Sequence, residues 1–250
     1  SVKNEYNKHI AFYDDKMRDQ VMWDQMISAQ IEKAIEEKQV HPYLQPIVDC
    51  DGKIIGAEAL IRWDHPKEGF LQPETFIPTF ERNGMIADLD KYIWRSACEI
   101  LSTWTGKKSN LFISINISPK DFLFMDVFAE INSLIKEFKI EPSRLRIEIT
   151  ETVMMTEVEN RMAILNRFRE SGFIVEMDDF GSGYSSLNQL KDMPLDVLKI
   201  DMKFLSSSKN SQKAEIILRN VLKLSGDLGL SSLTEGVETE DQYNMLSQMG

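Results

Sequence analysis

An α/β fold with its parallel sheet curled into a barrel is the fold class that the sequence predicts. Strand-like and helix-like periods alternate repeatedly from about residue 20 onward, which favours a parallel sheet, either barrel or doubly wound. The expected strands have one apolar and one polar face, whereas strands of an open sheet covered on both sides are apolar almost throughout. A barrel with helices outside and a polar mouth fits this pattern better.

The first elements are a helix and a hairpin. Apolar residues recur at helical spacing between residues 27 and 35, before the polar run EEKQ. The dipeptide Asp51-Gly52 is a strong hairpin signal. The strands expected at 43–49 and 53–63 therefore pair antiparallel, and the sheet begins with an antiparallel strand.

Strands and helices then alternate along the rest of the chain. The further strands are expected at 111–118, 145–150, 173–178, 197–201 and 232–237. The helices are expected within 86–104, 120–138, 157–170, 185–192, 211–227 and 239–248.

Composition narrows the range of partners. Lys and Arg total 29 against 40 Asp and Glu, a formal charge of −11, which argues against non-specific binding to nucleic acid polymers or anionic membranes. An anionic substrate would need metal ions or a few local cations. Cys50 and Cys98 form no disulfide framework or zinc motif and are interpreted as ordinary buried thiols. No apolar run is long enough for a membrane span, so this segment is expected to be cytoplasmic, although a longer parent protein could be membrane-anchored elsewhere.

Polar side chains converge near the carboxyl ends of the predicted strands. In LRIEIT (145–150) the apolar residues share one face, while Arg146, Glu148 and Thr150 share the other. Active sites of α/β barrels lie at the mouth formed by the strand ends. The residues expected to face inward at that mouth are Glu58, Asn116, Glu148, Asp178, Lys199 and Glu235.

The clustered acidic groups predict a metal site. Carboxylates in one mouth raise each other's pKa unless a cation lies among them, and oxygen ligands suit Mg²⁺ or Mn²⁺. Taken singly, each residue also has a structural explanation: Lys199 could extend to solvent, Glu148 could pair with Arg146 on the same face, and Asn116 could cap a loop.

Adjacent aspartates occur at the end of the strand expected at 173–178. Asp178 and Asp179 precede the turn GSGYSS. One carboxylate could bridge two metal ions while its neighbour reaches the second, as in two-metal sites for in-line displacement at phosphorus. A polar strand-to-helix turn with an Asx-type cap explains the pair equally well, and spacing alone favours neither.

Six short motifs occur in an order typical of one family. They are EALIRW (58–63), SINIS (114–118), EITET (148–152), DDFGSGYSSL (178–187), LKID (198–201) and EGVET (235–239). Over residues 22–250 the chain thereby resembles EAL domains, the bacterial cyclic di-GMP phosphodiesterases. Residues 1–21 resemble a linker or the remnant of a preceding GGDEF-like domain.

The resemblance implies a modified (β/α)8 barrel that hydrolyses cyclic di-GMP to linear 5′-pGpG with two Mg²⁺ or Mn²⁺ ions. It also implies a homodimer. The family's last barrel strand, with a motif like QGY, is expected to be missing from this chain. The alternative is a non-catalytic cyclic di-GMP receptor or protein-interaction module, although such members have usually lost several metal ligands. An unrelated barrel enzyme would require the motifs to agree by accident.

The resemblance also implies roles for individual residues. The implied metal ligands are Glu58, Asn116, Glu148, Asp178, Asp179 and Glu235, with Asp178 shared between the two ions. Catalysis would use Glu58 together with Lys199, which holds the attacking water, and Glu235, which acts as general base or second-metal ligand. Arg62 and Gln45 would contact the substrate, and Glu151 and Ser182 would anchor the DDFGSGYSS loop.

Overall fold

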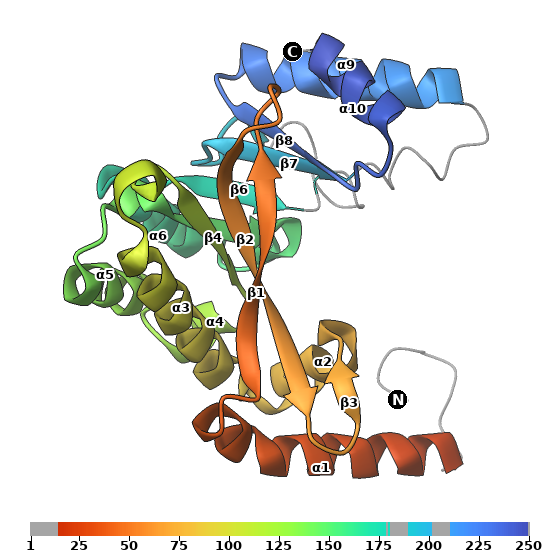
Figure 1. Ribbon diagram of the computed structural model, residues 1–250, viewed down its shortest axis with the longest axis vertical. Coiled ribbons are helices and arrows are strands. Elements are labelled where there is room, and N and C mark those ends of the chain that lie inside the picture. The colour runs from red at the N-terminus through yellow and green to blue at the C-terminus, as the bar shows by residue number, and fades with distance from the viewer. Residues whose placement is uncertain (1–14, 179, 181–189, 202–210, 250) are drawn as a thin grey trace. The chain divides into compact units, whose positions relative to one another are not determined.

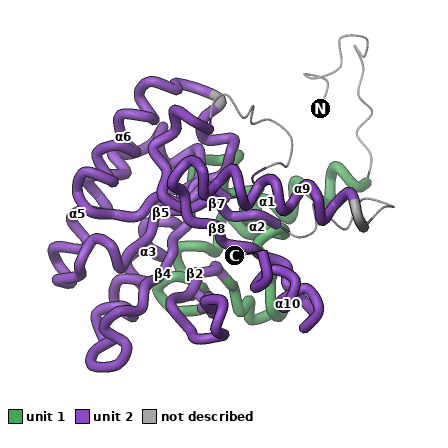
Figure 2. The backbone as a smooth tube through the Cα atoms, turned by 90° about the horizontal axis from the view of Figure 1, so that it is seen from above, with its two compact units in different colours: residues 1–41, 62–85 green, residues 42–61, 86–250 purple. Residues whose placement is uncertain are grey.

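The computed structural model describes residues 15–178, 180, 190–201 and 211–249 (Figure 1). It divides into two compact units, one of residues 1–41 and 62–85 and the other of residues 42–61 and 86–250 (Figure 2). The helix expected within 185–192 lies almost entirely outside the described residues.

Most of the second unit is built on a largely parallel sheet with the strand order β1-β2-β4-β5-β6-β7-β8, of which residues 40–41 and 62–65 belong to the first unit. The strands are β1 (Val40–Val48), β2 (Ile54–His65), β4 (Phe112–Ile117), β5 (Leu145–Thr150), β6 (Val175–Asp178), β7 (Val197–Asp201) and β8 (Ser231–Glu235). Every neighbouring pair from β2–β4 to β7–β8 is parallel. Among the described residues, β1 and β8 are the two ends of this sheet.

A tight turn makes the first strand antiparallel, as the sequence predicted. The Asp49 N–H donates to the Lys53 carbonyl at 2.9 Å, and Gly52 adopts a positive φ of 75°. Such a φ suits glycine, which has no Cβ to clash. Cys50 lies beside this turn and is exposed, so its interpretation as a buried thiol was wrong, whereas Cys98 is buried.

Helices pack on the apolar side of the sheet. They are α3 (Ile86–Thr103), α4 (Asp121–Phe124), α5 (Val127–Phe138), α6 (Val158–Glu170), α9 (Ser211–Asp227) and α10 (Glu240–Met249). The core joins Ile113, Ile147 and Ile149 of the strands to Leu101 of α3 and Ile131 of α5, all fully buried. Each such side chain contributes about 1.5–3 kcal/mol to folding, so the outward strand face supplies much of the unit's stability.

The segment 120–138, which was expected to contain one helix, is divided by a break at residues 125 and 126. Met125 is extended (φ −150°), and the Asp126 carboxylate accepts a hydrogen bond from the Ala129 N–H at 3.0 Å. This is an N-cap, which starts a new helix. The segment is therefore two helices, α4 and α5.

The strand expected at 173–178 begins later, at Val175. Phe173 instead donates its backbone N–H to the carbonyl of Phe168 at the end of α6. The strand expected at 232–237 ends at Glu235 because Gly236 has a φ of 70°.

The first unit contains α1 (Asp15–Glu36), β3 (Gly69–Leu71) and α2 (Pro73–Asn83). β3 pairs antiparallel with the end of β2. Trp63 of β2 packs against Phe76 and Phe80 of α2, with ring centroids 5.7 and 6.3 Å away. α1 crosses residue 22, the boundary that the sequence predicted between linker and domain.

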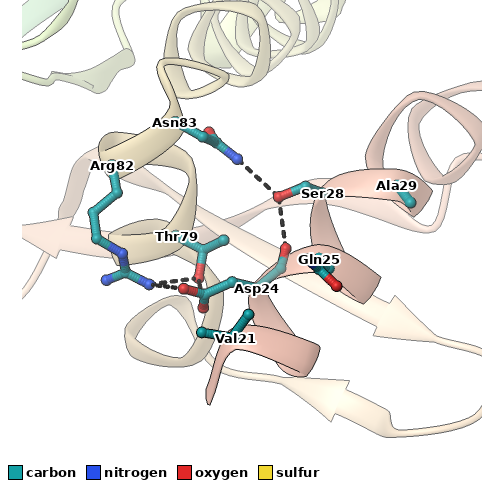
Figure 3. Close-up of a pocket in the computed structure, with 8 residues that line it drawn as sticks. All are labelled: Val21, Asp24, Gln25, Ser28, Ala29, Thr79, Arg82 and Asn83. Carbon is teal, nitrogen blue, oxygen red and sulfur yellow. Dashed lines mark hydrogen bonds and ion pairs between the residues drawn. The ribbon is translucent and has the colours of Figure 1, made fainter. Parts of the chain in front are cut away.

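Polar contacts join α1 to α2 around an open pocket (Figure 3). Asp24 accepts hydrogen bonds from Thr79 Oγ1 at 2.8 Å and from Arg82 Nη2 at 2.7 Å, and Asn83 donates to Ser28 Oγ at 2.8 Å (Figure 3). All of these side chains are therefore already partnered within the unit.

In the part of the chain that the structure describes, no helix is both long enough and apolar enough to span a membrane.

Gly56 is expected to be intolerant of a side chain. A Cβ built there would lie 2.6 Å from the ring atoms of the buried Phe112. Overpacking of this kind costs about 1–3 kcal/mol, so Gly56→Ala should lower the free energy of unfolding by about 2 kcal/mol in denaturant titration. Gly226 of α9 is the control, because a Cβ there meets nothing within 4 Å and Gly→Ala in a helix stabilises by about 0.5–1 kcal/mol. Equal stability of Gly56→Ala and the wild type would contradict the packing argument.

Candidate metal centre

One polar cluster fills the mouth of the sheet in the second unit. It consists of Glu58 on β2, Asn116 on β4, Glu148 on β5, Asp178 on β6, Lys199 on β7 and Glu235 on β8. The register of the parallel strands brings these residues together, with Asn116 opposite Glu148 and Thr150 opposite Asp178. The strand alternation read from the sequence therefore selects the right face of each strand.

Lys199 lies at the centre of the cluster, with 1% of its side chain exposed. Its Nζ is 2.5 Å from Glu235 Oε1, 3.1 Å from Glu58 Oε2 and 3.6 Å from Asp178 Oδ1, and it also donates to Glu148 Oε1. Burial lowers the pKa of this ammonium group, but the surrounding carboxylates outweigh burial and raise the pKa above its usual value. Lys199 is therefore protonated and positively charged. Its side chain lies inside the cluster and does not extend to solvent.

One ammonium group does not balance the carboxylates around it. Burial raises the pKa of Glu148 well above its usual value, and the neighbouring Glu58 and Asp178 raise it further against the opposing effect of Lys199. Burial also raises the pKa of Glu235. The cluster thus carries an excess of negative charge that an additional cation would relieve.

The oxygen atoms of the cluster fit a metal ion. Glu58, Glu148 and Glu235 each place a carboxylate oxygen within 4.8 Å of the others. Glu148 Oε2 is buried and has no hydrogen-bond partner among the described residues, and a buried oxygen without a partner is costly unless a ligand satisfies it. This carboxylate set can hold a divalent cation.

Asn116 is fixed from two sides. Its side-chain amide donates to Glu58 Oε1 at 3.1 Å. Its backbone carbonyl accepts from the indole N–H of Trp94 on α3 at 3.0 Å. The helix thereby holds the end of β4 in place, and the amide oxygen is the acceptor that Asn116 can offer to a ligand.

Three of the other residues implied by the resemblance, Glu151, Gln45 and Arg62, are not among the side chains that contact Lys199. Asp179 and Ser182 lie outside the described residues. Glu151 is buried after β5, and neither of its carboxylate oxygens has a hydrogen-bond partner among the described residues. Gln45 is exposed on β1, and Arg62 lies on the part of β2 that belongs to the first unit.

A second polar layer was missed by sequence reasoning. One structural explanation of Glu148 was that it pairs with Arg146. The partner of Arg146 is instead Glu176. Nη1 of Arg146 is 2.8 Å from Oε1 of Glu176, the inward-facing residue of the neighbouring strand. The available signal was strand alternation, which places Arg146 on the same face as Glu148 and Glu176 on the same face as Asp178.

Comparison with known proteins identifies the family. The EAL domain model matches residues 28–250, and the chain belongs to the EAL domain family, as the sequence motifs predicted. It is 34% identical over 215 residues to the cyclic di-GMP phosphodiesterase PA2567 of Pseudomonas aeruginosa, covering 86% of this chain and 37% of that protein. It is 30% identical over 251 residues to the bifunctional diguanylate cyclase/cyclic di-GMP phosphodiesterase MucR of the same bacterium, covering 100% of this chain and 37% of MucR.

Solved structures agree with this assignment. The PaMucR phosphodiesterase in its c-di-GMP complex has a TM-score of 0.84 and 31% identity, covering 90% of this chain and 92% of that one. The EAL enzyme Bd1971, in a form bound to cAMP and cyclic di-GMP, has a TM-score of 0.85 and 28% identity, covering 94% of this chain and 64% of that one. The chain spans just over a third of the length of the two curated relatives.

Removing one charge from the cluster should stabilise the metal-free protein. The folded-state pKa of Glu148 is raised, so its ionised form disfavours folding and stability falls as pH rises through that pKa. Glu148→Gln removes this cost, and at pH 7.5 in EDTA its free energy of unfolding should exceed that of the wild type by about 1 kcal/mol.

The pH dependence separates this effect from a packing effect. The gain from Glu148→Gln should shrink at pH 5, where protonation relieves the wild type. Glu141→Gln, at an exposed carboxylate before β5, should change stability at neither pH. A less stable Glu148→Gln protein at pH 7.5 would show that the Lys199–Glu148 contact outweighs the repulsion.

Proposed function

We propose that this chain is a metal-dependent phosphodiesterase that hydrolyses cyclic di-GMP to linear 5′-pGpG. The observation that carries the proposal is the buried Lys199 surrounded by four carboxylates at the mouth of an EAL-family sheet. The names of PA2567 and MucR, which describe cyclic di-GMP phosphodiesterases, support the same substrate.

We infer that two divalent ions, Mg²⁺ or Mn²⁺, bind at this cluster. The chain's ligands would be Glu58, Asn116, Glu148, Asp178, Asp179 and Glu235. The unpartnered Glu148 Oε2 and the excess negative charge support cation binding, and hard oxygen ligands suit these two metals. When bound, the ions neutralise the phosphodiester and lower the pKa of a coordinated water.

The protein's own groups would then direct the attack. Lys199 donates a hydrogen bond to the attacking water and holds its positive charge near the developing negative charge on phosphorus oxygens. Glu235 accepts the water's proton, and the raised pKa of its carboxyl group suits a general base. The new bond joins the water oxygen to phosphorus, the bond to one bridging ribose oxygen breaks, and that oxygen takes a proton from solvent.

Other residues and assemblies belong to the same proposal. Arg62 and Gln45 would contact the substrate, with Arg62 supplying a local cation for a substrate phosphate in a chain whose formal charge is −11. Glu151 and Ser182 would anchor the loop that follows β6. A homodimer working in the cytoplasm completes the proposal, with no nucleic acid polymer as partner and no membrane contact by this segment.

Glu58→Gln should abolish turnover. The substitution removes one of the three converging carboxylates and leaves the amide able to pair with Lys199. We expect kcat for cyclic di-GMP to fall at least 100-fold in Mn²⁺ or Mg²⁺, with pGpG measured by chromatography. Glu141→Gln is the matched control and should keep full activity.

The outcome separates an enzyme from a receptor. Formation of pGpG by the wild type and its loss in Glu58→Gln would support the proposal. A wild-type chain that binds cyclic di-GMP but forms no pGpG with either metal would be a receptor instead.

Arg62→Ala should affect substrate binding more than chemistry. A guanidinium group that pairs with a substrate phosphate in the ground state lowers KM. We expect KM to rise about tenfold and kcat to change less than threefold. A large fall in kcat with constant KM would instead place Arg62 among the groups that act in the transition state.

A further inference from the structure

A second layer of interior residues lies beneath the metal centre. Its strand positions are Gly56 on β2, Ser114 on β4, Arg146 on β5 and Glu176 on β6. Each precedes by two positions a residue of the metal centre on the same strand, namely Glu58, Asn116, Glu148 and Asp178. Residues two apart on a strand share a face and are separated by about 7 Å along it.

Directional contacts link three of these strands. Glu176 is fully buried, with a relative exposure of 0%. Its Oε1 accepts from Arg146 Nη1 at 2.8 Å, and its Oε2 accepts from Ser114 Oγ at 2.7 Å. Glu176 of β6 is thereby bonded to both β5 and β4, and both of its oxygens are satisfied.

An aromatic ring extends the layer to the fourth strand. The guanidinium carbon of Arg146 lies 3.3 Å from the centre of the Phe112 ring. The ring occupies the space beside Gly56, where a Cβ would approach it to 2.6 Å. The planar guanidinium is thus held by a carboxylate and by an aromatic face, which is a geometry that lysine cannot reproduce.

The role of this layer is better explained by the positioning of the strands than by a contribution to the free energy of folding. A buried ion pair often contributes no more to folding than hydrophobic residues of similar size would. What it adds is direction, because each hydrogen bond fixes two strands at a defined distance and angle. Metal ligands need such fixed geometry, and partners behind the ligands typically change metal affinity 10–100-fold.

Charge provides a second reason for Arg146. Without it, Glu176 would be a further unneutralised carboxylate in the interior that already holds Glu58, Glu148, Asp178 and Glu235. Arg146 confines this charge to the lower layer, so the upper carboxylates remain available to a cation.

We propose that Arg146, Glu176 and Ser114 are positioning residues for the metal centre, which set the placement of Asn116, Glu148 and Asp178 through strands β4, β5 and β6. For turnover the inference rests on the proposed phosphodiesterase function. For cation binding it rests only on the geometry of the cluster.

The test is the double variant Arg146→Met/Glu176→Met, which removes both charges and keeps a similar side-chain volume. Its thermal midpoint in EDTA should equal or exceed that of the wild type. The dissociation constant for Mn²⁺, measured by calorimetry, should rise about tenfold. With cyclic di-GMP, kcat should fall about tenfold while KM stays within twofold.

The matched control is a pair of oppositely charged residues outside the sheet. Arg95 and Glu137 join α3 to α5 through two hydrogen bonds of 2.7 and 2.8 Å. The double variant Arg95→Gln/Glu137→Gln should leave Mn²⁺ affinity and kcat unchanged, which shows that loss of an ion pair alone is not responsible.

The outcomes decide the matter. A folded Arg146→Met/Glu176→Met protein with wild-type Mn²⁺ affinity and kcat overturns the inference. If that variant does not fold, Ser114→Ala replaces it, and an Mn²⁺ dissociation constant within 1.5-fold of the wild type, instead of about threefold higher, overturns the inference. If the wild type forms no pGpG, the proposed function fails, and the Mn²⁺ comparison still decides the role of the layer.

Discussion

The second unit is organised around the opposition between one buried ammonium group and four carboxylates. Lys199 contacts Glu58, Glu148, Asp178 and Glu235, which arrive from four different strands. Repulsion among these carboxylates opposes folding, while the opposite face of the same strands contributes stability by burying isoleucine, leucine and valine against helices. Stability and site chemistry are thus divided between the two faces of one sheet, as is common where function requires unfavourable local interactions.

The alternation of residues along the strands made much of this arrangement predictable. In LRIEIT the fully buried Leu145, Ile147 and Ile149 belong to the apolar core on one face of the sheet. Glu148 lies on the other face, in the polar cluster around Lys199. The same alternation in the other strands identified Asn116 and Lys199 without any tertiary information. The hairpin at Asp51-Gly52 gave the antiparallel first strand. These features depend on a period of two residues and on glycine's freedom at positive φ, which are local properties of the chain.

Other features depend on contacts that a single sequence does not reveal. Arg146 and Glu148 share a face of one strand, but the partner of Arg146 comes from the next strand, through the stagger of the sheet. β3 has three residues, too few for a detectable period. α2 was missed because Pro78 lies inside it, and proline ordinarily argues against a helix interior, although Pro73 at its first position is a typical helix start. The break between α4 and α5 follows from a single capping side chain, Asp126.

The hydrogen bond from Trp94 to the backbone of Asn116 gives the molecule an internal optical reporter. The indole is almost completely shielded from water, with a relative exposure of 1%, and its N–H is bonded to the carbonyl of a residue that lines the cluster. Indole emission responds to the polarity and hydrogen bonding around the ring. A change at the β4 end would therefore change the surroundings of a chromophore on α3, and with Trp23, Trp63 and Trp104 replaced by phenylalanine the emission of Trp94 alone would report on the cluster.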